Sequence, residues 1–70
     1  MKKYTEYSIP TKFYSYKGFS GASRKQINDL DEDINNIIKL ENEAKENNYT
    51  TYTYKIIDNT TKEIVFTLNT

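Results

Sequence analysis

The chain of 70 residues contains no cysteine and no histidine. Without cysteine it can form neither a disulfide nor a thiolate metal site. Without histidine it lacks the commonest general base and the commonest metal ligand of proteins. A catalyst would have to use paired carboxylates or an activated serine, tyrosine or lysine. The sequence therefore predicts a protein that is not an enzyme and that holds no cofactor and no metal.

Long apolar runs are also missing. The longest runs comprise two or three residues, whereas a transmembrane helix needs about 20. No apolar stretch follows Lys2 and Lys3, so no signal peptide is predicted. We expect one small, soluble, cytoplasmic domain over residues 1–70, with no membrane contact. Such a chain buries only about 60% of its unfolded surface, so covering by a partner or a second copy would stabilise it.

Charge is balanced overall but unevenly distributed. Ten basic and ten acidic side chains give a net charge of zero. By count along the sequence, residues 1–22 carry +3, residues 23–48 carry −3, and residues 49–70 are neutral. Zero net charge disfavours general electrostatic binding of nucleic acid. The asymmetry allows opposed patches, which suit a specific protein partner.

The clearest structural signal is a hairpin made of residues 52–57 and 64–68. Both segments have strand composition, and Asp58 favours a turn between them. We expect a type I turn with a bulge that places Lys62 in the left-handed region. The register that collects the apolar side chains on one face pairs Ile57 with Glu63, Ile56 with Ile64, Tyr54 with Phe66 and Tyr52 with Leu68.

The middle of the chain predicts an amphipathic helix. Its start is either Ser23, which forms a capping box with Gln26, or Asn28, and its end is near Asn47–Asn48. Such a helix has about 20–25 residues and would overhang the hairpin. Apolar residues recur at three- and four-residue spacing: Ile27, Leu30, Ile34, Ile37, Ile38 and Ala44.

Residues 4–9 and 12–16 also have strand composition, and Pro10 separates them. They form either two short strands or one edge strand with Pro10 on its unpaired side. The predicted fold is α+β, with one long helix packed on a three- or four-stranded antiparallel sheet. The order is one or two strands, the helix, then two strands. The expected core comprises Ile34, Ile37, Tyr54, Ile56, Ile64 and Phe66.

Two polar segments could carry chemistry. Residues 18–25 combine glycine, serine and cations ahead of the predicted helix, and a helix N-terminus is receptive to phosphate. The segment lacks the Gly-Lys-Ser/Thr ending of a Walker loop. Asp29, Glu32 and Asp33 share one helix face and could hold a hard cation, but charge runs of this kind are usually solvated surfaces.

The basic, aromatic N-terminal third is the main candidate for binding. Interleaved tyrosine and lysine side chains are typical both of protein interfaces and of single-stranded nucleic-acid sites. We predict a protein-binding module, for example a phage or mobile-element inhibitor that occludes a host protein, with homodimerisation as the simplest association. The alternative function is binding of nucleic acid or of a nucleotide phosphate. A third possible function is mimicry of a nucleic-acid backbone by Asp29, Asp31, Glu32 and Asp33. The candidate binding residues are Lys12, Tyr14, Tyr16, Lys17, Ser20, Arg24 and Lys25.

Overall fold

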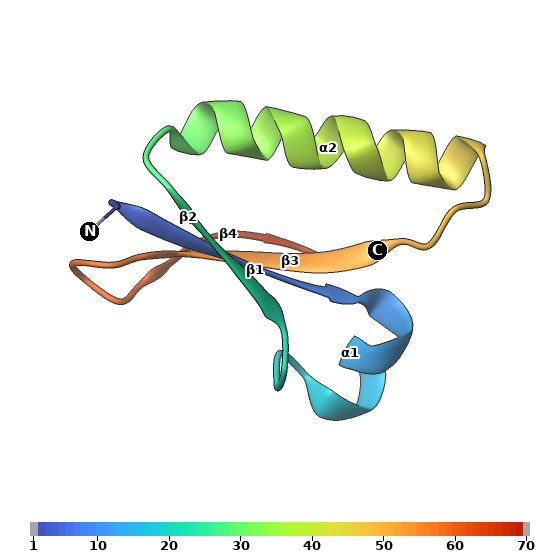
Figure 1. Ribbon diagram of the computed structural model, residues 1–70, viewed down its shortest axis with the longest axis horizontal. Helices are drawn as coiled ribbons and strands as arrows, with labels where there is room; N and C mark the ends of the chain where they lie inside the picture. The colour runs from blue at the N-terminus through green and yellow to red at the C-terminus, as the bar shows by residue number, and fades with distance from the viewer. Residues whose placement is uncertain (1, 70) are drawn as a thin grey trace.

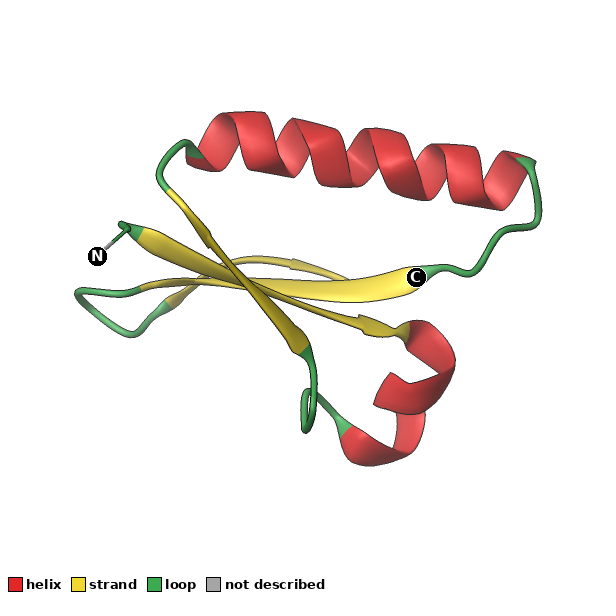
Figure 2. Ribbon diagram, in the orientation of Figure 1, coloured by secondary structure: helices red, strands yellow, loops and turns green. Residues whose placement is uncertain are grey.

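The computed structural model describes residues 2–69 as a helix lying across an antiparallel sheet (Figure 1). The strands are ordered β2-β1-β3-β4, and every neighbouring pair is antiparallel. The long helix α2 covers one face, and the short helix α1 lies on the other side (Figure 2). The elements are β1 (Tyr4–Pro10), α1 (Thr11–Lys17), β2 (Ser23–Ile27), α2 (Leu30–Glu46), β3 (Tyr52–Asp58) and β4 (Ile64–Leu68). The predicted α+β class, with one long helix on an antiparallel sheet, is confirmed.

The N-terminal third differs from the prediction. Residues 12–16 are helical and belong to α1 rather than to a strand. Pro10 ends β1, which is a central strand, and its fixed φ of −54° suits the residue that leads into a helix. β2 occupies the segment that was expected to begin the long helix.

Helix α2 begins later than either predicted start. Asp29 is its N-cap, and Asp29 Oδ1 accepts a hydrogen bond from the Glu32 amide at 3.0 Å. The end was predicted well, because Asn48 has a φ of 57° and the Tyr49 amide donates to the Ala44 carbonyl at 2.8 Å. With 17 residues, α2 is about 25 Å long. It is therefore about as long as a seven-residue strand of about 23 Å and shorter than predicted, but its last turns lie beyond the start of β3 (Figure 1).

The hairpin has the predicted turn but a different register. Lys62 has a φ of 66°, and Asp58 Oδ1 accepts the amides of Thr60 and Thr61 at 2.8 and 3.2 Å. Relative to the predicted register, the pairs of Tyr54 and Ile56 are shifted by two residues and that of Ile57 by one, because the ladder is irregular between Ile56 and Ile57. The observed pairs are Ile56 with Phe66, Tyr54 with Leu68 and Ile57 with Ile64.

A two-residue shift keeps Phe66 and Leu68 on the same face as Ile56 and Tyr54, but Ile64 lies beyond the irregularity and pairs with Ile57. Ile64 is consequently 59% exposed, so its predicted place in the core is wrong. The buried core cluster comprises Ile27, Ile37, Tyr54 and Ile56, against which Ile34, Phe66 and other apolar side chains pack.

The opposite sheet face is held by a polar network near the hairpin turn. The Thr5 hydroxyl donates to Asn59 Oδ1 at 2.6 Å, and Gln26 Nε2 donates to the Thr5 oxygen at 3.2 Å. Asn59 Nδ2 donates to the Lys2 carbonyl at 2.9 Å and to Gln26 Oε1 at 3.3 Å. These bonds fix β2 and the turn against β1.

Candidate functional site

The predicted binding residues do not form one site. Arg24 and Lys25 are neighbours on a strand, so their side chains point to opposite faces of the sheet. Lys17 and Ser20 do come together, at a cleft of about 300 Å³ that Phe13 also lines. The expected phosphate-receptive helix start does not exist at residues 18–25, because β2 follows that loop.

The aromatic residues of α1 divide between packing and exposure. The Tyr14 ring packs edge-on against Phe19, with the ring centroids 4.9 Å apart. The Tyr16 ring lies edge-on to Phe13, with the ring centroids 6.4 Å apart, but Tyr16 remains 70% exposed. Lys12 Nζ lies 5.3 Å from the centroid of the Phe13 ring. The N-terminal segment thus presents Phe13 and Tyr16 to solvent.

A row of side chains crosses all four strands on the face opposite α2. Arg24 and Lys55 lie opposite Tyr7 on either side, and Thr67 lies opposite Lys55. The two cations stand over the Tyr7 ring at 5.9 and 5.0 Å from its centroid. Lys55 also lies 4.7 Å from the centroid of Phe19. This face therefore carries a positive, aromatic centre.

The acidic residues singled out in the sequence have three different environments. Asp29 caps α2, and Glu32 is exposed in its first turn. Asp33 is only 5% exposed and points toward the sheet. They do not form a common solvated face, because Asp33 lies on the buried stripe of the helix with Ile37.

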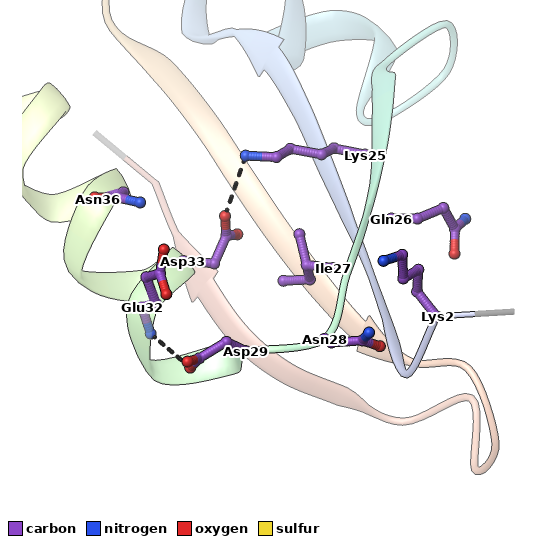
Figure 3. A pocket seen from close by; sticks show the side chains of 9 residues that line it. All are labelled: Lys2, Lys25, Gln26, Ile27, Asn28, Asp29, Glu32, Asp33 and Asn36. Carbon is purple, nitrogen blue, oxygen red and sulfur yellow. Dashed lines mark hydrogen bonds and ion pairs between the residues drawn. The ribbon is translucent and has the colours of Figure 1, made fainter.

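Asp33 meets a second buried carboxyl group and a lysine under α2. Glu6 on β1 is 8% exposed, and Lys25 lies opposite it on β2. Lys25 Nζ is 3.5 Å from Asp33 Oδ1, and the two side chains point toward each other (Figure 3). Two clefts, of about 230 and 260 Å³, both have Lys25, Asp33 and Asn36 in their walls. Glu6 was not predicted as a site residue, because its role depends on a contact distant in sequence.

The environment of Glu6 favours its neutral form. Burial, a side-chain hydrogen bond with Asp33 and the negative charge of Asp33 raise the pKa of Glu6 to about 8, against a smaller opposing effect of Lys25. One proton is therefore held between the two carboxyl groups at neutral pH. Raised carboxyl pKa values are common at functional sites.

Another buried carboxylate lies further along α2. Glu41 is 4% exposed, and its Oε1 accepts the backbone amide of Tyr52 at 3.1 Å. Burial and a side-chain hydrogen bond with Glu41 raise the pKa of Tyr54 above its usual range. The interface between α2 and the sheet is therefore polar on one flank and apolar around Ile37.

The two edges of the sheet differ in character. β2 carries Arg24 and Lys25, whereas β4 has the sequence IVFTL, without charge or proline. Ile64 and Val65 on β4 are 59% and 40% exposed. Charged residues on an edge strand discourage pairing with another chain, and β4 has no such protection.

Within residues 2–69, no group of three or more acidic side chains is placed to hold a metal ion. In the same part of the chain, neither helix has the length and apolar character needed to cross a bilayer. No protein-family model, curated protein or solved structure matches the chain. The functional proposal therefore rests on the surfaces described above.

Proposed function

We propose that the protein is a non-enzymatic protein-binding module that adds a strand of another polypeptide to the β4 edge. This proposal is supported by the difference between the two edge strands. β2 carries two cations, which disfavour pairing with another strand, whereas β4 is apolar and carries no charge. Strand addition is a recurrent mode of recognition in which main-chain hydrogen bonds provide affinity and alternate side chains provide specificity.

A second copy of the chain is the simplest occupant of this edge. Antiparallel pairing of two β4 strands about an axis through Phe66 places Val65 opposite Thr67 of the second copy. No charged residue within Ile64–Leu68 would face another. Such pairing is isologous, continues the sheet from four strands to eight and leaves both α2 helices on the same face.

The same edge would also suit an inhibitor, because β4 could pair with a strand of the protein that is inhibited. An inhibitor or regulator of phage or mobile-element origin would pair β4 with an exposed edge or an extended segment of a host protein. In both cases, the exposed apolar side chains of β4 become covered.

Sedimentation velocity on a Val65→Lys variant tests this proposal. Lysine on an edge strand opposes pairing, so the parent should associate at micromolar concentration and the variant should remain monomeric. Asn42→Lys, on an exposed position of α2, is the matched control and should behave as the parent. For a host target, capture from lysate should be lost in V65K and kept in N42K. A monomeric parent with no partner that depends on Val65 contradicts the proposal.

Binding of single-stranded nucleic acid is a second candidate function, supported by the Arg24–Tyr7–Lys55 row. Aromatic rings stack with bases, and adjacent cations neutralise phosphates. Titration of a fluorescent oligonucleotide at 50 and 200 mM salt tests it. Binding that weakens with salt and is lost in Arg24→Ser and Lys55→Ser would support this function, whereas salt-independent or absent binding excludes it.

A further inference from the structure

The cleft at the end of β1 has no part in strand addition at β4. Its volume is about 300 Å³, and its walls are formed by Ile9, Pro10, Phe13, Lys17, Ser20 and Gly21, none of which belongs to β4. Half of these residues are apolar and half are polar. Apolar walls with a few polar groups are typical of sites that bind small molecules, and this volume suits a small group.

The apolar part of the cleft offers surface to a ligand. Ile9 is only 6% exposed, whereas Phe13 beside it is 40% exposed. An apolar group that covers the Phe13 ring removes this surface from water, which favours binding. Gly21 has a φ of 79°, and a Cβ at this position would meet no atom within 4 Å. The backbone of Gly21 can therefore be approached closely.

The polar part of the cleft offers three hydrogen-bond donors. The amides of Ser20 and Ala22 donate to the carbonyls of Lys17 and Phe19, at 3.2 and 3.0 Å, and so fix the loop. The Gly21 amide, the Ser20 hydroxyl and the Lys17 ammonium group donate to no acceptor within the described part of the chain. All three groups suit an anion, and the ammonium group adds a charge-assisted bond.

The charge around the cleft selects the kind of anion. Residues 7–28 contain four cations and no acidic residue, and the acidic helix α2 lies on the other side of the sheet (Figure 2). Lys17 is the one cation among the six lining residues, so it matches a single negative charge. A phosphate monoester carries close to two negative charges at neutral pH. A carboxylate therefore fits the cleft better than a phosphate.

We propose that this cleft binds a carboxylate that carries an apolar group. The apolar group packs on Phe13 and Ile9, and the carboxylate accepts hydrogen bonds from Lys17, Ser20 and the Gly21 amide. The carboxylate belongs either to the C-terminal residue of another polypeptide or to a free small acid, which share this chemistry. Capture of a C-terminal carboxylate by backbone amides is a recurrent mode of peptide recognition.

NMR titration of the full chain with acetyl-Gly-Leu tests the proposal, and acetyl-Gly-Leu-amide is the control that lacks the carboxylate. Saturable shifts of the Phe13, Ser20 and Gly21 amides are expected with the acid, and binding of the amide should be at least about fivefold weaker. Isocaproate, which has the leucine side chain without the peptide, separates the two sources. Tighter binding of the peptide identifies a C-terminus, and equal or tighter binding of isocaproate identifies a free acid.

Two variants make the titration specific. Lys17→Gln should weaken binding of the acid about three- to fivefold, because the ammonium group is lost from an exposed position. Phe13→Ser should weaken binding of both the acid and the amide, because the apolar wall is lost. Lys39→Gln removes the same charge from an exposed position of α2 and should bind the acid as the parent does.

The variant V65K separates this proposal from strand addition, because it changes only the β4 edge and should bind the acid as the parent does. Shifts that are absent at about 50 mM acid, equal for the acid and the amide, or unchanged in K17Q would contradict carboxylate binding. Phenyl phosphate that binds more tightly than phenylacetate would overturn the choice of a carboxylate.

Discussion

The Glu6 carboxyl group of β1 and the Asp33 carboxyl group of α2 hydrogen-bond to each other inside the helix–sheet interface. Two carboxyl groups form such a bond only while one of them holds a proton. Burial and the neighbouring Asp33 raise the pKa of Glu6 to about 8. Part of the attachment of α2 to the sheet therefore depends on a proton that is lost as the pH rises through about 8.

We expect the free energy of unfolding to fall as the pH rises from 5 to 8. The folded protein holds the proton of Glu6 far more tightly than the unfolded chain, where the pKa is near 4.5. The stabilising contribution is complete below that lower value and is lost as the pH rises through the higher one. The loss is at most about 1.4 kcal/mol per pH unit. Urea denaturation at several pH values measures it.

Two variants separate this effect from other titrations. Glu6→Gln keeps a neutral side chain at every pH, so its stability should change little between pH 5 and 8. Glu32→Gln, at an exposed position of α2, should keep the parent's slope. Equal stability of the parent at pH 5 and pH 8 would contradict the assignment of the proton to this pair.

The features that the sequence predicts well are set by local chemistry. The long helix follows from apolar spacing, and its end follows from an asparagine that tolerates a positive φ. The left-handed Lys62 follows from the two amides that Asp58 accepts in the turn. These signals lie within a few residues of the structure that they specify.

The features that the sequence does not predict depend on tertiary contacts. Residues 12–16 have strand composition but lie beyond a proline that leads the chain into α1, and no neighbouring strand pairs with them. The irregular ladder near Ile57 displaces Ile64 to the surface. In the sequence, Asp33 cannot be distinguished from its exposed acidic neighbours Asp31 and Glu32. Only the contact with Glu6, which is distant in sequence, gives Asp33 a shared proton.

Replacing Lys62 with glycine should leave the stability unchanged or slightly raised. Lys62 has a φ of 66°, a conformation that glycine adopts without steric cost. The gain is offset by the greater freedom of glycine in the unfolded chain, so the change should stay within about 1 kcal/mol. Chemical denaturation measures it, and a larger loss would be inconsistent with strain at this position.

Ile37 and Ile64 should respond differently to truncation. Ile37 is 2% exposed in the core, so Ile37→Ala should cost about 2–5 kcal/mol. Ile64 is 59% exposed, so Ile64→Ala should cost less than about 1 kcal/mol. Melting followed by circular dichroism compares the two. Similar losses in both variants would show that the hairpin register is wrong.

Asn59→Ala should destabilise the sheet despite its position beside a turn. The variant removes the acceptor of the Thr5 hydroxyl and the donor to the Lys2 carbonyl. Leaving the buried Thr5 hydroxyl without its acceptor costs about 1–3 kcal/mol. Asn35→Ala on the exposed face of α2 is the control and should have little effect. Denaturation curves that coincide for N59A and the parent would exclude a structural role for the network.

Strand addition at β4 is tested most directly by amide hydrogen exchange measured at several protein concentrations. The free side of β4 offers unpaired amides in a monomer, and these become hydrogen-bonded when a second strand pairs with it. We expect protection of Ile64–Leu68 to increase with concentration in the parent and in N42K, but not in V65K. Protection of the β2 amides from exchange should not change with concentration, because the charges of Arg24 and Lys25 disfavour pairing at that edge. Exchange in β4 that is independent of concentration, or protection that appears at β2 instead, would contradict pairing of two copies at this edge.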